Sequence, residues 1–124
     1  MAERIYLIDD EPDMTTLAER LFTLKGFVVC VNNDPSAGLS HLIDTDYDLI
    51  FIDLMMPGMN GFDLLDSLRK TPRHASTPII ILSAKRLNDA ERKRLLLNNA
   101  RFLLKPLSPR QMFEAVQGTL RLQN

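Results

Sequence analysis

The chain has 124 residues, of which 45% are hydrophobic and 25% are charged, and its formal net charge is −1. These values are typical of a soluble globular protein, and we expect one domain over residues 1–124. No apolar stretch is long enough to cross a membrane, and the N-terminus lacks the extended apolar region of a signal peptide. The single cysteine, Cys30, excludes an intramolecular disulfide, and we expect it to be a buried thiol in a reducing cytosol.

The small net charge conceals two halves of opposite charge. Residues 1–68 carry 13 acidic and 3 basic side chains, whereas residues 69–124 carry 3 acidic and 12 basic ones. A solvated helix face and a nucleic-acid site both produce such clusters. Because aromatic residues do not alternate with these charges, we expect a protein contact rather than direct nucleic-acid binding. Six of the basic residues gather in one segment: Lys85, Arg86, Arg92, Lys93, Arg94 and Arg101.

Five apolar runs alternate with five segments of helical character, which is typical of repeated β-α-β units and a parallel sheet. The nearly continuous apolar character of the runs fits strands that are buried on both faces. In chain order the sequence predicts a strand at 4–8, a helix at 12–25, a strand at 27–31, a helix from Asp34-Pro35, a strand at 48–53, a helix at 60–70, a strand at 78–83, a helix at 87–97, a strand at 101–105 and a helix from Ser108.

Two histidines lie outside the strands. We expect His41 to be a partly packed residue of the second helix. His74 lies in the polar connector 71–77, where we expect it to be solvated.

Five polar residues lie at the ends of four predicted strands: Asp9, Asp10, Asp53, Ser83 and Lys105. Because the carboxyl ends of parallel strands meet at one edge of the sheet, these side chains should lie close together. Carboxylate oxygens are the ligands that magnesium prefers, and a lysine ammonium pairs with phosphate. The pattern therefore predicts a magnesium site beside a phosphate site.

Each of these residues also has an ordinary structural explanation. The acids at 9–11 can cap the first helix through Glu11 or Asp13, and Asp53 can be a turn residue. Ser83 can cap the fourth helix, and Lys105 can lie on the surface. Converging carboxylates repel one another unless a cation neutralises them, so their common location favours the metal site.

Over almost its whole length the sequence resembles the receiver domain of two-component response regulators. The matching landmarks are the pair Asp9-Asp10, Asp53 within the segment 52–61, Ser83-Ala84 and Lys105-Pro106. The resemblance implies a flavodoxin-like, doubly wound α/β fold, with a five-stranded parallel sheet in the order 2-1-3-4-5 and five helices.

The resemblance also implies a role for each site residue. Asp53 would be the phosphoacceptor, and Asp10, Asp53 and the backbone carbonyl of Met55 would bind Mg²⁺ or Mn²⁺, with Asp9 acting through water. Lys105 would neutralise phosphoryl oxygens, and the Lys105-Pro106 peptide should be cis.

Two further positions would act as a switch. Ser83 would donate its hydroxyl to the phosphoryl group, and Phe102 occupies the family's aromatic switch position. Met55 and Lys85 lie at positions that vary in the family and flank the path of the hydrolytic water, so we expect them to tune the lifetime of the phosphorylated state.

The implied partners are a sensor histidine kinase or phosphotransfer protein, and a downstream protein or output domain. The switched face, and a homodimer contact, would involve the fourth helix, the fifth strand and the fifth helix. The domain would not be an enzyme in the ordinary sense, since it would catalyse only its own phosphorylation and dephosphorylation.

Two other functions are compatible with part of this pattern. Phosphatases of the haloacid-dehalogenase type also use an aspartyl nucleophile with magnesium. They carry a second aspartate two residues later, where this chain has Met55, and a substrate-covering insertion for which 124 residues leave no room. The other function is that of an interaction module, a receiver that no longer takes phosphate. The intact set of Asp9, Asp10, Asp53, Ser83 and Lys105 argues against it.

Overall fold

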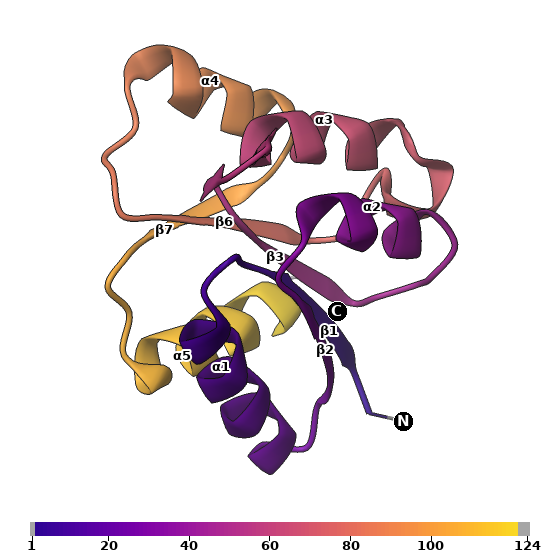
Figure 1. Ribbon diagram of the computed structural model, residues 1–124, viewed down its shortest axis with the longest axis vertical. Helices are drawn as coiled ribbons and strands as arrows, with labels where there is room; N and C mark the ends of the chain where they lie inside the picture. The colour runs from indigo at the N-terminus through magenta and orange to yellow at the C-terminus, as the bar shows by residue number, and fades with distance from the viewer. Residues whose placement is uncertain (1, 122–124) are drawn as a thin grey trace.

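A five-stranded parallel sheet forms the centre of the protein, with helices on both faces (Figure 1). The computed structural model describes residues 2–121. The strand order is β2-β1-β3-β6-β7, which is the predicted order 2-1-3-4-5 because β4 and β5 form a separate small sheet. The strands of the main sheet are β1 (Arg4–Ile8), β2 (Val28–Asn32), β3 (Leu49–Asp53), β6 (Ile79–Ser83) and β7 (Arg101–Leu104).

All five predicted helices are present, and each helix end that the sequence predicts lies within two residues of its predicted position. Helices α1 and α5 cover one face of the sheet, and α2, α3 and α4 cover the other (Figure 1). Within residues 2–121, none of the helices combines the length and apolar character that a membrane crossing requires. The helices are α1 (Pro12–Leu24), α2 (Pro35–Ile43), α3 (Gly61–Lys70), α4 (Asp89–Leu97) and α5 (Pro109–Arg121).

The core has two halves, one on each face of the sheet. In β1, Ile5 and Leu7 pack with α1 and α5, whereas Tyr6 and Ile8 pack with the helices on the other face. Successive residues of a strand point to opposite faces. A strand covered on both faces therefore needs an uninterrupted apolar run, which explains the pattern in the sequence.

The segment after β3 forms an element that the sequence did not predict, the hairpin β4 (Met55–Met56) and β5 (Met59–Asn60). Its turn contains Gly58 with a φ of 81°. Gly61, the first residue of α3, lies so close to the chain after β3 that a Cβ atom would be 2.7 Å from Leu54 Cα and 2.8 Å from the Asp53 carbonyl oxygen. This close packing holds the hairpin directly beside Asp53.

The expectation for His74 was wrong. It ends a short 3₁₀ helix, η1 (Pro72–His74), and is completely buried. Its Nε2 atom lies 2.7 Å from the Leu42 carbonyl oxygen and 2.9 Å from that of Thr45, and its Nδ1 atom lies 3.0 Å from Thr77 Oγ1. The connector is polar because its side chains bind the backbone at the end of α2.

Cys30 is half-buried rather than fully buried, because its strand, β2, is an edge strand with a neighbour on one side only. His41 is a partly packed residue of α2, as expected: its ring stacks on Tyr6 at 5.1 Å, and its Nε2 atom lies 2.7 Å from the Tyr47 hydroxyl. The Lys105-Pro106 peptide is cis, in agreement with the prediction.

Candidate functional site

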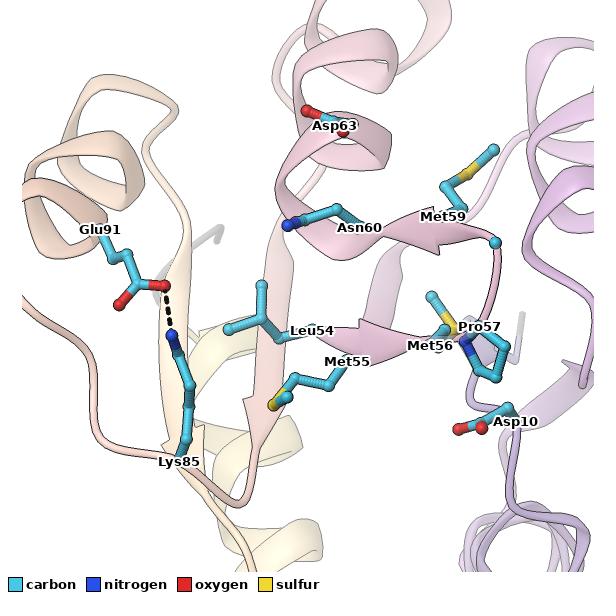
Figure 2. Close-up of a pocket in the computed structure, with 11 residues that line it drawn as sticks. Asp10, Leu54, Met55, Met56, Pro57, Met59, Asn60, Asp63, Lys85 and Glu91 are labelled. Carbon is cyan, nitrogen blue, oxygen red and sulfur yellow. Dashed lines mark ion pairs between the residues drawn. The ribbon is translucent and has the colours of Figure 1, made fainter.

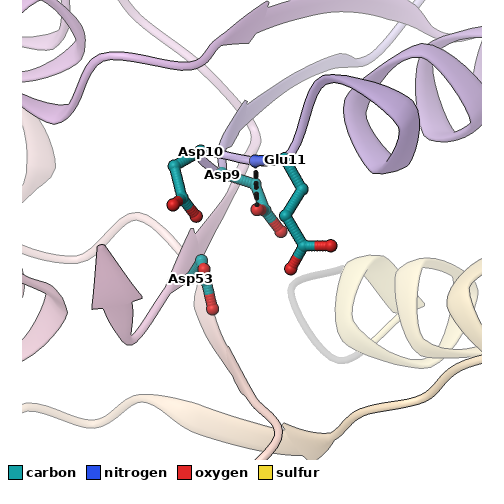
Figure 3. Close-up of side chains that lie close together, drawn as sticks. All are labelled: Asp9, Asp10, Glu11 and Asp53. Atoms are coloured by element: carbon teal, nitrogen blue, oxygen red, sulfur yellow. Dashed lines mark hydrogen bonds between the residues drawn. The ribbon is translucent and has the colours of Figure 1, made fainter. Parts of the chain in front are cut away.

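The carboxyl ends of the central strands bring the predicted acidic residues together. Asp9 and Asp10 follow β1, and Asp53 is the last residue of β3, which pairs with β1 in register. One carboxylate oxygen from each of Asp9, Asp10, Glu11 and Asp53 lies within 4.8 Å of the others. Figure 3 shows that these side chains point towards a common space. The predicted convergence is therefore present, and Glu11 is an additional member.

Lys105 lies among these acids. Its Nζ atom is 2.8 Å from Asp9 Oδ2, 3.5 Å from Asp53 Oδ1 and 3.5 Å from Glu11 Oε1. The Asp9 side chain is completely buried, and only 14% of the Lys105 side chain is exposed. One ammonium therefore faces several carboxylates where little solvent can screen them.

Burial and charge shift the pKa values of two of these groups. The pKa of Asp53 is raised to about 6, first by burial and then by the negative charge of Asp9, while Lys105 acts in the opposite direction. Burial tends to lower the pKa of Lys105, but its bond to Asp9 and the other nearby acids outweigh that effect and raise it. Lys105 is therefore a cation at neutral pH, and Asp53 is mostly a carboxylate.

Asp9 is held in place by its neighbours. Its Oδ1 accepts a 3.0 Å hydrogen bond from the Glu11 backbone N–H, and its carbonyl oxygen accepts a 2.7 Å bond from Asn33 Nδ2. Glu11 occupies the N-cap position of α1 without a capping bond from its side chain. Capping of the first helix by Glu11 is therefore not the explanation for this run of acids.

Ser83 ends β6 and is buried. Its Oγ atom accepts a 3.1 Å hydrogen bond from the Lys85 backbone N–H, and its carbonyl oxygen accepts a 2.7 Å bond from the Lys105 N–H. The second bond joins the ends of β6 and β7 and keeps Ser83 beside Lys105. Ser83 does not cap α4, because Asn88 occupies that N-cap position.

The donor set fits a divalent cation of the magnesium class. Lys105 pairs with Asp9, Glu11 and Asp53, and Asp10 adds a fourth carboxylate to the cluster, so negative charge is in excess at the site. Carboxylate oxygens are hard ligands, which Mg²⁺ prefers. A cation would neutralise the repulsion that contributes to the raised pKa of Asp53.

A groove of about 790 Å³ leads away from Asp10 (Figure 2). Met55, Met59 and Lys85 are among the residues that line it. Met55 is 61% exposed. Phe102 on β7 is half-buried and packs against the core beneath α3 and α4. Both predicted tuning residues therefore lie on the groove, and the predicted switch residue Phe102 lies beneath the helices.

The basic residues between Lys85 and Arg101 do not form one surface patch, because several of them are paired with other side chains. Arg94 Nη2 lies 3.0 Å from Asp63 Oδ1 and 2.6 Å from Asp66 Oδ2, which joins α4 to α3. Lys85 pairs with Glu91, and Arg101 donates a 2.8 Å hydrogen bond to Thr119. Several of these charges therefore fasten one element to another.

Sequence reasoning did not select Glu91. It is the third residue of α4, and it forms a capping box with Asn88, in which each side chain accepts a hydrogen bond from the backbone N–H of the other. The Asn-x-x-Glu spacing is a local signal for such a cap. The pairing with Lys85 depends on how the loop folds and could not be found from spacing.

Comparisons with known proteins agree with this arrangement. Residues 5–117 match the model of the response regulator receiver domain. The chain is 36% identical over 121 residues to the transcriptional regulatory protein CpxR of Escherichia coli K12, covering 95% of this chain and 49% of that protein. It is 32% identical over 123 residues to the DNA-binding response regulator MtrA of Mycolicibacterium smegmatis, covering 98% and 52% respectively.

A solved structure shows the same fold. The CheY-like response regulator receiver domain protein from Methanospirillum hungatei JF-1 superposes with a TM-score of 0.91 at 21% identity, covering 99% of this chain and 97% of that one. The chain spans about half the length of the curated relatives that it matches. Strand order, the acidic rim and the family match together show that the chain belongs to the response regulator receiver domain family.

Proposed function

We propose that Asp53 accepts a phosphoryl group from the phosphohistidine of a sensor kinase or phosphotransfer protein. The observation that carries this function is the position of the Asp53 carboxylate, which is buried, 3.5 Å from Lys105 Nζ and grouped with Asp9 and Asp10. Lys105, together with a divalent cation held by the acids, would neutralise the phosphoryl oxygens beside the Asp53 nucleophile.

The reaction is a nucleophilic substitution at phosphorus. A carboxylate oxygen of Asp53 bonds to phosphorus as the bond from phosphorus to the histidine nitrogen breaks, and the electron pair of that bond leaves with the imidazole. The product is an acyl phosphate on Asp53. The Lys105 ammonium lies close enough to the carboxylate to stabilise charge on phosphoryl oxygens.

Asp10, Asp53 and the backbone carbonyl of Met55 would hold Mg²⁺ or Mn²⁺, with Asp9 contributing through water. When bound, the ion supplies neutralisation of phosphoryl charge and helps to orient the phosphoryl group. Asp9 also keeps Lys105 in place through the 2.8 Å ion pair.

The phosphoryl group would then change the surface formed by α4, β7 and α5. Its oxygens offer the Ser83 hydroxyl a new acceptor, and Phe102 would follow the movement of the loop after β6. Two conformations of this surface whose free energies differ by a few kcal/mol are sufficient for such a switch. The same surface would contact a downstream protein, an output domain or a second copy of the chain.

The relatives support an output that acts on transcription, because CpxR is a transcriptional regulatory protein and MtrA a DNA-binding response regulator. In this function the described domain itself does not contact nucleic acid. It catalyses only its own phosphorylation and dephosphorylation, and we place it in the cytoplasm.

Intact-mass measurement after incubation with acetyl phosphate and Mg²⁺ tests the function. The wild type should gain one phosphoryl group, whereas Asp53→Asn should gain none, and EDTA should abolish the gain. Equal labelling of Asp53→Asn, or labelling that persists undiminished in EDTA, would refute the assignment.

A further inference from the structure

Lys85 and Glu91 form an ion pair across the wall of the groove. The Lys85 Nζ atom lies 2.9 Å from Glu91 Oε2, and the side chains are 45% and 19% exposed (Figure 2). Lys85 belongs to the loop after β6, whereas Glu91 lies in the first turn of α4. The bond to Lys85 is the main reason that the pKa of Glu91 is lowered.

Both ends of this ion pair are anchored by other hydrogen bonds. On the sheet side, Ser83 Oγ accepts the 3.1 Å bond from the Lys85 N–H. On the helix side, Glu91 Oε1 accepts a 2.9 Å bond from the Asn88 N–H, and Asn88 Oδ1 accepts a 2.8 Å bond from the Glu91 N–H. A continuous chain of contacts therefore leads from the buried hydroxyl of Ser83 to the first turn of α4.

The other end of α4 is fastened separately. Arg94 binds Asp63 and Asp66 on α3, and Asn98 Nδ2 donates a 3.0 Å hydrogen bond to Asp66 Oδ1. The first turn is thus tied to the loop after β6 and the last turn to α3. Movement of Ser83 would pull on the first turn while the last turn stays in place.

We infer that the Lys85–Glu91 ion pair transmits the movement of Ser83 to the first turn of α4, so that Glu91 is a positioning residue of the switch. This role rests on the phosphoryl acceptance at Asp53 proposed above. Without the ion pair, the loop residues between Ser83 and Asn88 can absorb the movement by changing their own backbone angles. With it, Lys85 and the capping box move as one unit.

Stabilisation of the folded domain is a weaker explanation for the Lys85–Glu91 ion pair than transmission of movement. Lys85 is nearly half exposed, and ion pairs of that kind contribute little to folding. Removing the pair should therefore leave the thermal unfolding temperature almost unchanged while it reduces the response of α4. A coupling role and a stabilising role are thus separable by measurement.

Glu91→Gln is the informative variant, because glutamine retains the oxygen that caps Asn88 and loses the charge that binds Lys85. Asp89→Asn is its matched control: it removes a carboxylate from the same helical turn, but Asp89 is fully exposed and 3.9 Å from Arg92. Lys85→Met should act like Glu91→Gln, and Lys85→Arg should retain the behaviour of the wild type.

The measurement is hydrogen exchange of single amides by NMR with Mg²⁺, before and after addition of beryllofluoride, a phosphoryl mimic. The Lys85 amide, bonded to Ser83, reports on the loop, and the Arg92 amide, bonded to the Asn88 carbonyl oxygen at 3.0 Å, reports on the first turn of α4. In Glu91→Gln the change at Lys85 should persist, while the change at Arg92 should shrink about threefold, the size expected for a partly exposed ion pair.

The transmission role is overturned if Glu91→Gln shows the full change at Arg92, if Asp89→Asn loses as much of it, or if Glu91→Gln also loses the change at Lys85. A wild type that responds at Lys85 but not at Arg92, or at neither amide, also overturns this role. Phosphoryl acceptance at Asp53 is overturned only if acetyl phosphate with Mg²⁺ adds no mass to the wild type.

Discussion

Lys105 Nζ lies 2.8 Å from Asp9 Oδ2, closer than its 3.5 Å separation from Asp53 Oδ1. In the resting domain the lysine is therefore primarily the counter-ion of Asp9, and a phosphoryl group on Asp53 would compete for it. This pairing sets the electrostatic balance of the whole site, because Asp9 is completely buried.

Lys105→Met should destabilise the metal-free domain by about 3 kcal/mol, since removing one partner leaves the other as an unpaired buried charge. The measurement is urea unfolding in EDTA at pH 7. Lys85→Met, which removes a half-exposed lysine, should cost less than about 1 kcal/mol. Equal costs for the two variants would contradict the central role of the Lys105–Asp9 pair.

Asp53→Asn should stabilise the metal-free domain at pH 7 by about 3 kcal/mol, because the folded pKa of about 6 lies roughly two units above the value of 3.8 for a free side chain. A raised folded pKa means that the stability contributed by Asp53 is complete below pH 3.8 and is lost as the pH rises through 6. The gain from the substitution should therefore disappear at pH 4.

Urea unfolding at pH 4 and pH 7 checks that prediction. Asp13→Asn is the control, since Asp13 is an exposed acid in the first turn of α1. The negative charge of Asp13 is slightly stabilising there, so its removal should leave stability unchanged or lower it slightly at pH 7. A gain for Asp53→Asn that is the same at both pH values would show that charge repulsion is not its cause.

The affinity for Mg²⁺ should decrease as the pH falls through 6, because the ion needs the ionised form of Asp53. Below that pH the apparent affinity should fall about tenfold per unit if binding displaces one proton. Isothermal titration calorimetry between pH 5 and 7.5 measures this dependence. An affinity that is constant over this range would remove Asp53 from the set of ligands.

The acyl phosphate should be long-lived, because neither tuning residue assists hydrolysis. Met55 offers no hydrogen bond to orient a water and can cover the phosphoryl group with apolar bulk, and a charged Lys85 cannot accept a proton. Met55→Asn and Lys85→Glu should each speed phosphate release, measured after removal of the phosphodonor.

Lys85→Glu also breaks the pair with Glu91, so Glu91→Gln is the control that breaks the pair without adding an acid. If Met55→Asn and Lys85→Glu release phosphate at the rate of the wild type, these side chains do not control the access of water.

His74→Ala should destabilise the domain by about 2–4 kcal/mol, because it opens a cavity and leaves buried carbonyl groups without their donor. His41→Ala, at an exposed position of α2, should cost less. Urea unfolding of the two variants at pH 7 provides the comparison, and equal costs would contradict the structural role of His74.

Short-range signals were sufficient for the elements and for the place of the site. Each strand is a short apolar run, and each site residue directly follows such a run or ends it, so the parallel arrangement delivers Asp9, Asp53 and Lys105 to one rim. The predicted helix start at Ser108 is confirmed by a capping box: the Ser108 N–H donates to Gln111 Oε1 at 2.8 Å, and the Gln111 N–H donates to Ser108 Oγ at 3.1 Å. Such a cap depends only on residues three positions apart. The sequence by itself therefore determined the fold and the location of the acids.

Contacts between distant residues were decided only by the tertiary structure. His74 lies in a polar segment, yet it is buried because the folded chain brings the Leu42 and Thr45 carbonyl groups to it. In the same way, the ion pairs Lys105–Asp9 and Lys85–Glu91 form because the folded loops place these charged groups within reach of each other. Composition and spacing show which charged groups the chain contains. Which of them pair depends on their distances and burial in the folded protein, and these are set only when the sheet brings distant segments together.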